Sequence, residues 1–258
     1  MINKLIKKVL NKFGYTIINT DLYNNLSKKE IPYDLDQDFK EVYERTKQFT
    51  MSSVERMYAL YKATEYIVNN NIPGDIVECG VWRGGSMMIS ALTLLKMNNI
   101  NKIIYLYDTY EGMSRPSEKD IRVYDNKPAL KMWKKLHGKD FNKWDYASLD
   151  EVKKNLYSTG YPKENIEFFK GKVEDTIPSF VPEKISLLRL DTDFYESTYH
   201  ELLHLFPKLA LHGVIIIDDY GYWKGQKEAV DKYFKKNNIK ILLNRIDESA
   251  IIGIKLNN

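Results

Sequence analysis

Short apolar runs that alternate with helical segments constrain the fold of this chain more than any other feature. Each run is apolar on both sides, as in a strand buried between two layers of helices. Strands joined through helices pair in parallel. The runs are residues 76–80, 103–107, 166–169, 185–190 and 214–217. We therefore expect an α/β fold with a doubly wound, mostly parallel sheet.

The end of the chain follows a different pattern. Residues 239–243 and 250–254 are separated by only a short polar turn, which predicts an antiparallel hairpin. Five parallel strands followed by this hairpin form the seven-stranded sheet of a Rossmann-like class I methyltransferase. A dehydrogenase shares the first part of the order, so the fold alone does not choose between the two classes.

We predict two parts in the chain. Residues 1–45 contain an amphipathic helix and a polar connector, and residues 46–258 form the α/β domain. Helical spacing across residues 51–69 places a helix before the first strand. An unusually long insertion at residues 112–161 is typical of a lid beside a binding site.

The composition excludes several classes of protein. Hydrophobic residues make up 43% and charged residues 29% of the chain, which is too apolar for a disordered protein. The formal net charge of +4 is too small to indicate nucleic acid binding. No apolar run reaches the roughly 20 residues of a spanning helix. The single cysteine, Cys79, excludes an intramolecular disulfide and suits the cytoplasm, where thiols stay reduced.

Residues 1–13 predict a basic amphipathic helix. Lysines occupy one side, and apolar residues occupy the other at positions 2, 5, 6, 9, 10 and 13. We expect such a helix to dock on its own domain or on a second subunit, and we expect a homodimer. The alternative is a peripheral contact with an anionic membrane surface.

A glycine-rich turn at residues 78–86 follows the first strand and opens a helix. Its glycines allow the backbone to approach a ligand closely, and the free N–H groups of the helix attract an anion. The carboxylate of S-adenosylmethionine suits that position, and Glu78 suits its ammonium group. Trp82 stands where the G-x-G-x-x-G pattern of dinucleotide-binding proteins needs a glycine. The alternative is a turn that binds no ligand.

Acidic residues follow three of the predicted strands. Asp108 ends the second strand, where a carboxylate can accept both ribose hydroxyls of an adenosine, although a lone aspartate there is often only a turn former. Asp191 and Asp193 follow the fourth strand. Asp218 and Asp219 follow the fifth. Because ligands of open α/β sheets bind at the carboxyl edge, these side chains are candidate site residues.

A divalent cation explains why several carboxylates gather at one edge, since they would otherwise repel one another. All-oxygen ligation favours Mg²⁺, with Mn²⁺ or Ca²⁺ as alternatives. The competing interpretation is that these acids pair with Arg189, Lys224 or Lys227 and hold no metal.

Longer motifs stand in a characteristic order from about residue 46 onward. They are TMSSVER at 50–56, VECGVWRGGS at 77–86, DTYEGM at 108–113, GKVEDTIP at 171–178, LRLDTDFYEST at 188–198, PKL at 207–209 and GVIIIDDY at 213–220. Together they resemble the macrocin O-methyltransferase family, which methylates sugar hydroxyls. One departure is His212, where the family often carries a glycine.

The resemblance implies a role for individual residues. Asp191, Asp218 and Asp219 would hold Mg²⁺, and Asp191 or Asp193 would accept the proton of the acceptor hydroxyl. Residues expected to bind S-adenosylmethionine are Met51, Glu78, Gly80, Trp82, Arg83, Gly84, Ser86, Asp108, Thr109, Gly171, Val173 and Asp175.

We therefore predict an S-adenosylmethionine-dependent O-methyltransferase that acts on a sugar hydroxyl of a glycan, a nucleotide sugar or a glycosylated natural product. The cation would orient the acceptor and lower its pKa for attack on the methyl group. Trp133, Trp144 and Tyr146 of the insertion either cover the sugar or pack a small core. The alternatives are an NAD-linked sugar oxidoreductase and a non-catalytic Rossmann-like binding protein.

Overall fold

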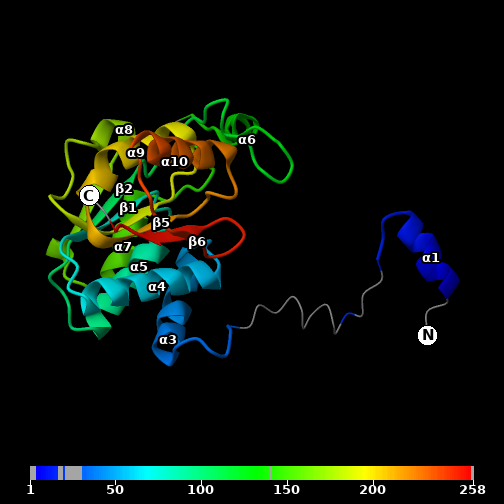
Figure 1. Cartoon of the computed structure of the whole chain (residues 1–258). Coiled ribbons are helices and arrows are strands. Elements are labelled where there is room, and N and C mark those ends of the chain that lie inside the picture. The colour runs from blue at the N-terminus through cyan, green and yellow to red at the C-terminus, as the bar shows by residue number, and fades with distance from the viewer. Residues whose placement is uncertain (1–3, 17–19, 21–30, 140, 257–258) are drawn as a thin grey trace. The chain divides into compact units, whose positions relative to one another are not determined.

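The computed structural model describes residues 4–16, 20, 31–139 and 141–256. The chain divides into two compact units, Met1–Leu35 and Asp36–Asn258. The smaller unit contains helix α1 (Lys4–Lys12), and the larger contains the sheet (Figure 1).

A seven-stranded sheet runs through the larger unit, as the sequence predicts. Its strands are β1 (Asp75–Cys79), β2 (Ile104–Asp108), β3 (Ile166–Lys170), β4 (Ile185–Leu190), β5 (Leu209–Ile217), β6 (Leu243–Arg245) and β7 (Ile251–Ile254). They lie in the order β3-β2-β1-β4-β5-β7-β6. The first five pair in parallel, and β7 pairs antiparallel with β5 and β6. The order changes direction between β1 and β4, and ligands of such sheets bind at the carboxyl edge of that point.

The terminal hairpin is shorter than the apolar pattern predicts. The pattern indicates a strand at residues 239–243, but β6 begins only at Leu243. Leu243 pairs with Gly253, so the register carries residues 239–241 past the end of β7. Ile239 and Ile241 pack against the hydrophobic core as partly buried side chains. The alternating apolar residues at 239–241 therefore reflect packing against the core and not pairing in the sheet.

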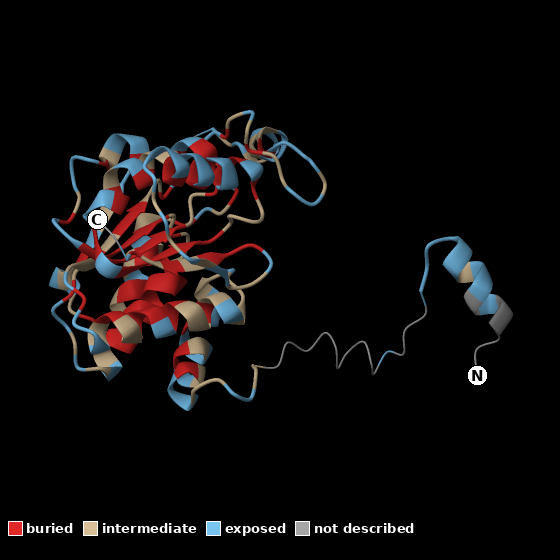
Figure 2. Ribbon diagram, in the orientation of Figure 1, coloured by how far each residue is buried: buried red, intermediate tan, exposed pale blue. Residues whose placement is uncertain are grey.

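Helices cover both faces of the sheet (Figure 1). On one face lie α3 (Gln37–Thr46), α4 (Val54–Asn69), α5 (Gly85–Lys96) and α7 (Leu149–Tyr157). On the other lie α8 (Val173–Thr176), α9 (Tyr195–Leu205) and α10 (Lys224–Lys236). Short 3₁₀ helices are η1 (Lys47–Phe49), η2 (Lys163–Asn165) and η3 (Phe206–Lys208). The inner strands β1, β2, β4 and β5 are mostly buried (Figure 2), which explains why their sequences are largely apolar, whereas β3 and β6 are partly exposed.

Helix α3 belongs to the larger unit, although the sequence groups it with the connector. Phe39 and Val42 of α3 are buried, and the helix packs against α4 and α5. The aromatic ring of Phe39 meets the edge of Tyr58 on α4 at a centroid distance of 5.0 Å. The structural boundary thus falls before Asp36, because the apolar face of this short helix completes the layer.

The insertion between β2 and β3 contains two different parts. Helix α7 packs against α5 and forms part of the regular helical layer. Residues 112–139 and 141–148, with helix α6 (Ala129–Leu136), project beyond that layer (Figure 1). Trp144 of this projection packs in one hydrophobic cluster with Phe194 and Trp223. Residues of this projecting part, unlike α7, line the cavity at the carboxyl edge of the sheet, so the projecting part is the one that can cover that edge.

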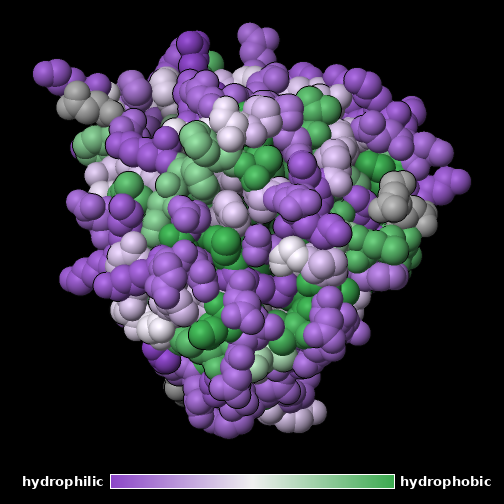
Figure 3. All heavy atoms as spheres, turned by 90° about the vertical axis from the view of Figure 1, so that its left-hand side faces the viewer, coloured by the Kyte–Doolittle hydropathy of each residue, from purple (hydrophilic) through white to green (hydrophobic). Residues whose placement is uncertain are grey.

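The surface has the ordinary character of a globular protein. The face in Figure 3 is largely hydrophilic, with hydrophobic side chains scattered among polar ones. Within the described part of the chain, we find no helix with the length and apolar character that crossing a bilayer requires.

Candidate active site

A cavity of about 430 Å³ lies at the carboxyl edge of the sheet. Its wall includes the glycine-rich turn after β1, the segment before α4, the projecting part of the insertion and the loops after β4 and β5. The cavity therefore occupies the edge at which the topology predicts a ligand.

The turn after β1 is held against the neighbouring loop by a glycine and an aspartate. Gly80 has a φ of 81°, and a Cβ atom there would lie 2.1 Å from the carbonyl oxygen of Asp191, so only glycine fits. Asp108 Oδ2 accepts hydrogen bonds from the backbone N–H groups of Val81 at 2.6 Å and Trp82 at 3.2 Å. Its Oδ1 accepts from the N–H of Tyr110 at 2.6 Å. Asp108 thus shapes the turn and also lines the cavity.

Helix α5 begins at the cavity wall. Its N-cap residue is Gly84, which has a φ of 86° and offers no side-chain acceptor to the first turn. Gly85 and Ser86, the first residues of the helix, line the cavity. The first-turn N–H groups and the positive end of the helix dipole therefore suit a carboxylate.

Glu78 lies beneath this turn, fully buried at 0% exposure. Its Oε1 accepts a hydrogen bond from Arg189 Nη1 at 2.7 Å, whereas Oε2 has no hydrogen-bond partner among the described residues. Burial raises the pKa of Glu78 to about 7, against the opposing effect of Arg189. A buried acceptor without a partner is costly, so Oε2 fits a cationic donor such as an ammonium group.

The other predicted cofactor residues divide into two groups. Glu78, Arg83, Gly84 and Asp175 lie outside the cavity wall that the described residues form. Arg83 pairs with Glu151, its Nε lying 2.6 Å from Oε1. The predicted residues that do line the cavity are Met51, Gly80, Trp82, Ser86, Asp108, Thr109, Gly171 and Val173. Most of the predicted set therefore lines the cavity, and the roles of these residues in binding stay predictions.

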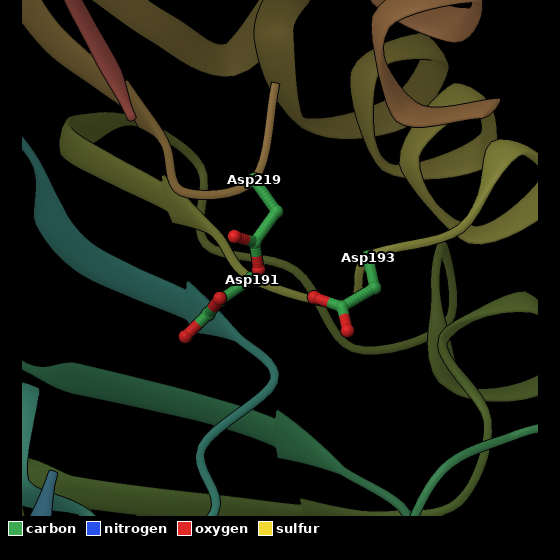
Figure 4. A group of neighbouring side chains, drawn as sticks. All are labelled: Asp191, Asp193 and Asp219. Carbon is green, nitrogen blue, oxygen red and sulfur yellow. The ribbon is translucent and has the colours of Figure 1, made fainter. Parts of the chain in front are cut away.

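Three aspartates converge on the cavity (Figure 4). Asp191, Asp193 and Asp219 each contribute a carboxylate oxygen, and these oxygens lie within 4.8 Å of one another. Burial raises the pKa of all three side chains, and repulsion from neighbouring carboxylates raises it further. A bound cation would remove this repulsion, so the donor set fits a hard divalent metal ion.

Asp218 points into a different environment. Its Oδ1 accepts from Arg189 Nη2 at 2.7 Å, and its Oδ2 accepts from Arg56 Nη1 at 2.5 Å. The structure therefore groups Asp193 with the two remaining predicted metal ligands and pairs Asp218 with arginines. Arg189 Nη1 also contacts Asp191 Oδ2 at 2.8 Å. Part of the competing interpretation thus holds, because Arg189 neutralises some of these acids.

The two lysines of that interpretation lie elsewhere. Lys224 Nζ donates to Asn126 Oδ1 at 2.6 Å, and Lys227 pairs with Asp231 on its own helix.

Arg56 is a site residue that we did not single out from the sequence. It lies on α4, and its Nε donates to Asp247 Oδ2 at 2.6 Å on the turn between β6 and β7. It also contacts Ser249 and lies 3.6 Å from Asp219 Oδ1. The only signal in the sequence is its place in the TMSSVER motif. Arg56 therefore connects three segments that are far apart in the chain.

The wall of the cavity also includes residues of the insertion and residues that follow β5. Asp145, a second residue missed from the sequence, lines it, and burial together with the nearby charge of Asp219 raises its pKa to about 6. Trp144 both packs in the cluster and borders the cavity. Trp133 stacks on His137 instead. Further wall residues are Arg122, Met113, Met132, Tyr222 and Trp223.

This fold and this site define a class I O-methyltransferase. The solved structure of the O-methyltransferase NovP is 27% identical to this chain, covers 93% of it and 100% of its own length, and superposes with a TM-score of 0.72. The chain belongs to the Macrocin-O-methyltransferase (TylF) family, whose model matches residues 7–253. The expected family and fold are thereby confirmed, and the family membership gives no support to the oxidoreductase alternative.

Two relatives show the same activity class. Demethyldecarbamoylnovobiocin O-methyltransferase of Streptomyces niveus is 32% identical over 202 residues, which cover 78% of this chain and 74% of the relative. The 8-demethyl-8-(2,3-dimethoxy-alpha-L-rhamnosyl)-tetracenomycin-C 4'-O-methyltransferase of Streptomyces olivaceus is 28% identical over 255 residues, covering 96% and 89%. Both similarities extend across most of the chain.

Proposed function

We propose that this chain transfers the methyl group of S-adenosylmethionine to a sugar hydroxyl of a glycan, a nucleotide sugar or a glycosylated natural product. The observation that carries the proposal is one cavity whose wall includes both the turn after β1 and three convergent aspartates. The names of the relatives support the sugar acceptor, since one methylates a rhamnosyl compound and another is a mycinamicin III 3''-O-methyltransferase.

The residues proposed to bind S-adenosylmethionine include a partner for each charge of its amino-acid group. The first turn of α5 would bind the carboxylate, and Glu78 Oε2 would accept from the ammonium group. Asp108 already accepts three backbone N–H bonds, and its carboxylate would position the ribose while it holds the turn. When bound, S-adenosylmethionine supplies the electrophilic methyl group.

The carboxylates that converge on the cavity are suitable ligands for Mg²⁺, or for Mn²⁺ or Ca²⁺. Asp191 and Asp219 belong both to the set implied by the family resemblance and to the set that the structure assembles, so we propose these two as ligands. Asp193 or Asp218 would supply the third carboxylate, and Asp191 or Asp193 would accept the proton of the acceptor hydroxyl. When bound, the cation supplies positive charge that orients the acceptor hydroxyl and favours its ionisation.

The aromatic wall would contact the sugar ring. Trp144, Tyr222 and Trp223 line the cavity, and the face of an aromatic ring packs well against the C–H groups of a sugar. Trp144 is held by edge contacts to Phe194 at 5.8 Å, so its position does not depend on the acceptor. This rigidity would hold the hydroxyl in line with the methyl group.

Calorimetry and a transfer assay together test the proposal. Full-length protein is titrated with S-adenosylhomocysteine, NAD and Mg²⁺, and labelled S-adenosylmethionine is then supplied with a panel of sugars, with and without a chelator. We expect binding of S-adenosylhomocysteine and Mg²⁺, and sugar methylation that the chelator abolishes. Transfer that continues unchanged with chelator contradicts the metal, and tight NAD binding without S-adenosylhomocysteine binding contradicts the whole proposal. Cofactor binding with no transfer to any sugar favours the non-catalytic alternative.

A further inference from the structure

Helix α1 presents an apolar face that the described residues of its own unit leave exposed. Ile6 and Val9 are each 51% exposed and Phe13 is 73% exposed. Ile6 and Val9 are three positions apart and share one side of the helix, and Phe13 follows in the turn directly after Lys12. The unit to which they belong is separate from the sheet domain, which begins at Asp36.

The opposite side of α1 carries an unusual concentration of charge. The whole chain has 39 Lys and Arg against 35 Asp and Glu. Residues 1–20 contain four lysines, at positions 4, 7, 8 and 12, and no acidic residue. The entire positive excess of the protein therefore resides in this segment, and the remaining charges balance.

We propose that α1 binds an anionic lipid surface. Ile6, Val9 and Phe13 would enter the boundary between headgroups and acyl chains, while Lys8 and Lys12 would remain among the anionic headgroups. A second copy of α1 would bring the same lysines together, and the balanced remainder of the chain offers no net negative charge to attract them. Charge complementarity thus selects an anionic partner outside the protein.

The chain length between α1 and the sheet domain suits a tether. In the sequence, residues 13–35 lie between Lys12, where α1 ends, and Asp36, where the larger unit begins, and a chain can reach at most about 3.4 Å per residue. The helix could therefore lie on a surface without requiring that the catalytic cavity face it. Lipid binding by α1 needs neither the cofactor nor the acceptor, so a test of this proposal does not depend on the proposed reaction.

Vesicle sedimentation of the full chain tests the proposal. Vesicles of phosphatidylcholine with phosphatidylglycerol are compared with vesicles of phosphatidylcholine alone, at low and high salt. We expect sedimentation with the anionic vesicles only, and release at high salt because screening weakens the attraction.

Matched variants separate the two faces of the helix. Val9→Gln should weaken vesicle binding roughly tenfold because it removes apolar burial, whereas Asn11→Gln, a substitution at an exposed polar position of the same helix, should not change it. Lys8→Gln with Lys12→Gln should weaken binding roughly fivefold for each lysine. Methyl transfer to a soluble acceptor should be equal in all of them.

Three results would overturn the proposal. Equal sedimentation with both kinds of vesicle, or with neither, would show that anionic lipid is not the partner. A dimer by light scattering that dissociates in Val9→Gln would identify a second copy as the occupant. Protection of α1 from hydrogen exchange in the absence of vesicles would show that the helix docks on its own domain.

Discussion

Glu78 and Arg189 are register partners on the adjacent parallel strands β1 and β4, and Arg189 Nη1 donates to Glu78 Oε1 at 2.7 Å. The Arg189 side chain is only 3% exposed and serves Asp191 and Asp218 as well. One buried guanidinium thus pairs with Glu78 and with an acid after each of β4 and β5. Its five donors in a fixed plane can satisfy several carboxylates at once, whereas a lysine offers three donors and no such fixed geometry.

Removing this guanidinium should destabilise the fold. Arg189→Met leaves the Glu78 carboxylate buried without a cation and should lower the free energy of unfolding by about 3–5 kcal/mol, measured by urea denaturation. Glu78→Gln should change it by less than about 1 kcal/mol, since an amide oxygen can still accept from Arg189. The same Glu78→Gln variant should bind S-adenosylhomocysteine roughly tenfold more weakly, because a charge-assisted bond to the ammonium is lost. Wild-type stability in Arg189→Met would contradict this account.

Substitution of Asp219 should separate metal binding from cofactor binding. Asp219→Asn should weaken Mg²⁺ binding roughly tenfold or more, because the neutral amide is a poorer ligand for a hard cation. The affinity for S-adenosylhomocysteine should stay within about twofold in the same calorimeter. Asp150→Asn, at an exposed position in the first turn of α7, is the control and should change neither affinity. Equal loss of both ligands in Asp219→Asn would mean that the fold of the site has collapsed.

Asp193 and Asp218 should behave differently without metal. Asp218→Asn removes the charge that Arg56 and Arg189 share and should cost about 1–3 kcal/mol of unfolding free energy. Asp193→Asn should not reduce stability in a metal-free buffer, since it relieves repulsion from Asp219. Urea denaturation with a chelator measures both, and Mg²⁺ titration then shows which of the two side chains is the third ligand. A larger stability loss in Asp193→Asn would contradict the grouping of the carboxylates.

Glu201 should make stability depend on pH. It is fully buried, its Oε1 accepts from Thr192 Oγ1 at 2.7 Å, and burial raises its pKa to about 8 from the ordinary value of 4.5. The folded protein therefore keeps a proton that the unfolded chain releases, so this group makes stability fall as the pH rises from about 4.5 to 8.

Glu201→Gln should remove that part of the pH dependence, because glutamine does not ionise. Above pH 8 the variant should be more stable than the parent by a few kcal/mol, on the order expected from such a pKa difference. Thermal melting across the pH range measures the effect. Parallel curves for the two proteins would show that Glu201 is not protonated in the folded state.

His212 should be a site where glycine stabilises the chain. It has a φ of 63°, in the left-handed region that glycine adopts without strain, and its N–H donates to the carbonyl of Lys255 at 2.7 Å. His212→Gly keeps this bond and should raise the free energy of unfolding by about 0.5–1 kcal/mol. His212→Ala retains the unfavourable φ and serves as the control, so it should show no such gain. The difference between the two variants measures the backbone effect alone.

The sequence predicted the fold because the relevant signals are local. Apolar runs such as 185–190 indicate a strand that is buried on both faces. The glycine-rich turn indicates a backbone that passes too close to its neighbours for a side chain to fit. The same kind of pattern wrongly predicted a strand at residues 239–241. Side chains that pack against a core can alternate in the same way as those of a paired strand. The sequence pattern also did not assign α3 to the α/β domain. The helix has only ten residues of mixed polarity, and its sequence does not determine which elements it packs against.

Local sequence also determined that acids follow β4 and β5, and therefore that carboxylates would meet at one edge of the sheet. It did not determine which of them would converge. That outcome depends on Arg56, which reaches Asp218 from α4, and on Arg189, which reaches it from β4. Only the tertiary structure decided that Asp218 turns to these arginines while Asp193 joins Asp191 and Asp219, since electrostatic pairing depends on distances between side chains that the order of residues does not contain.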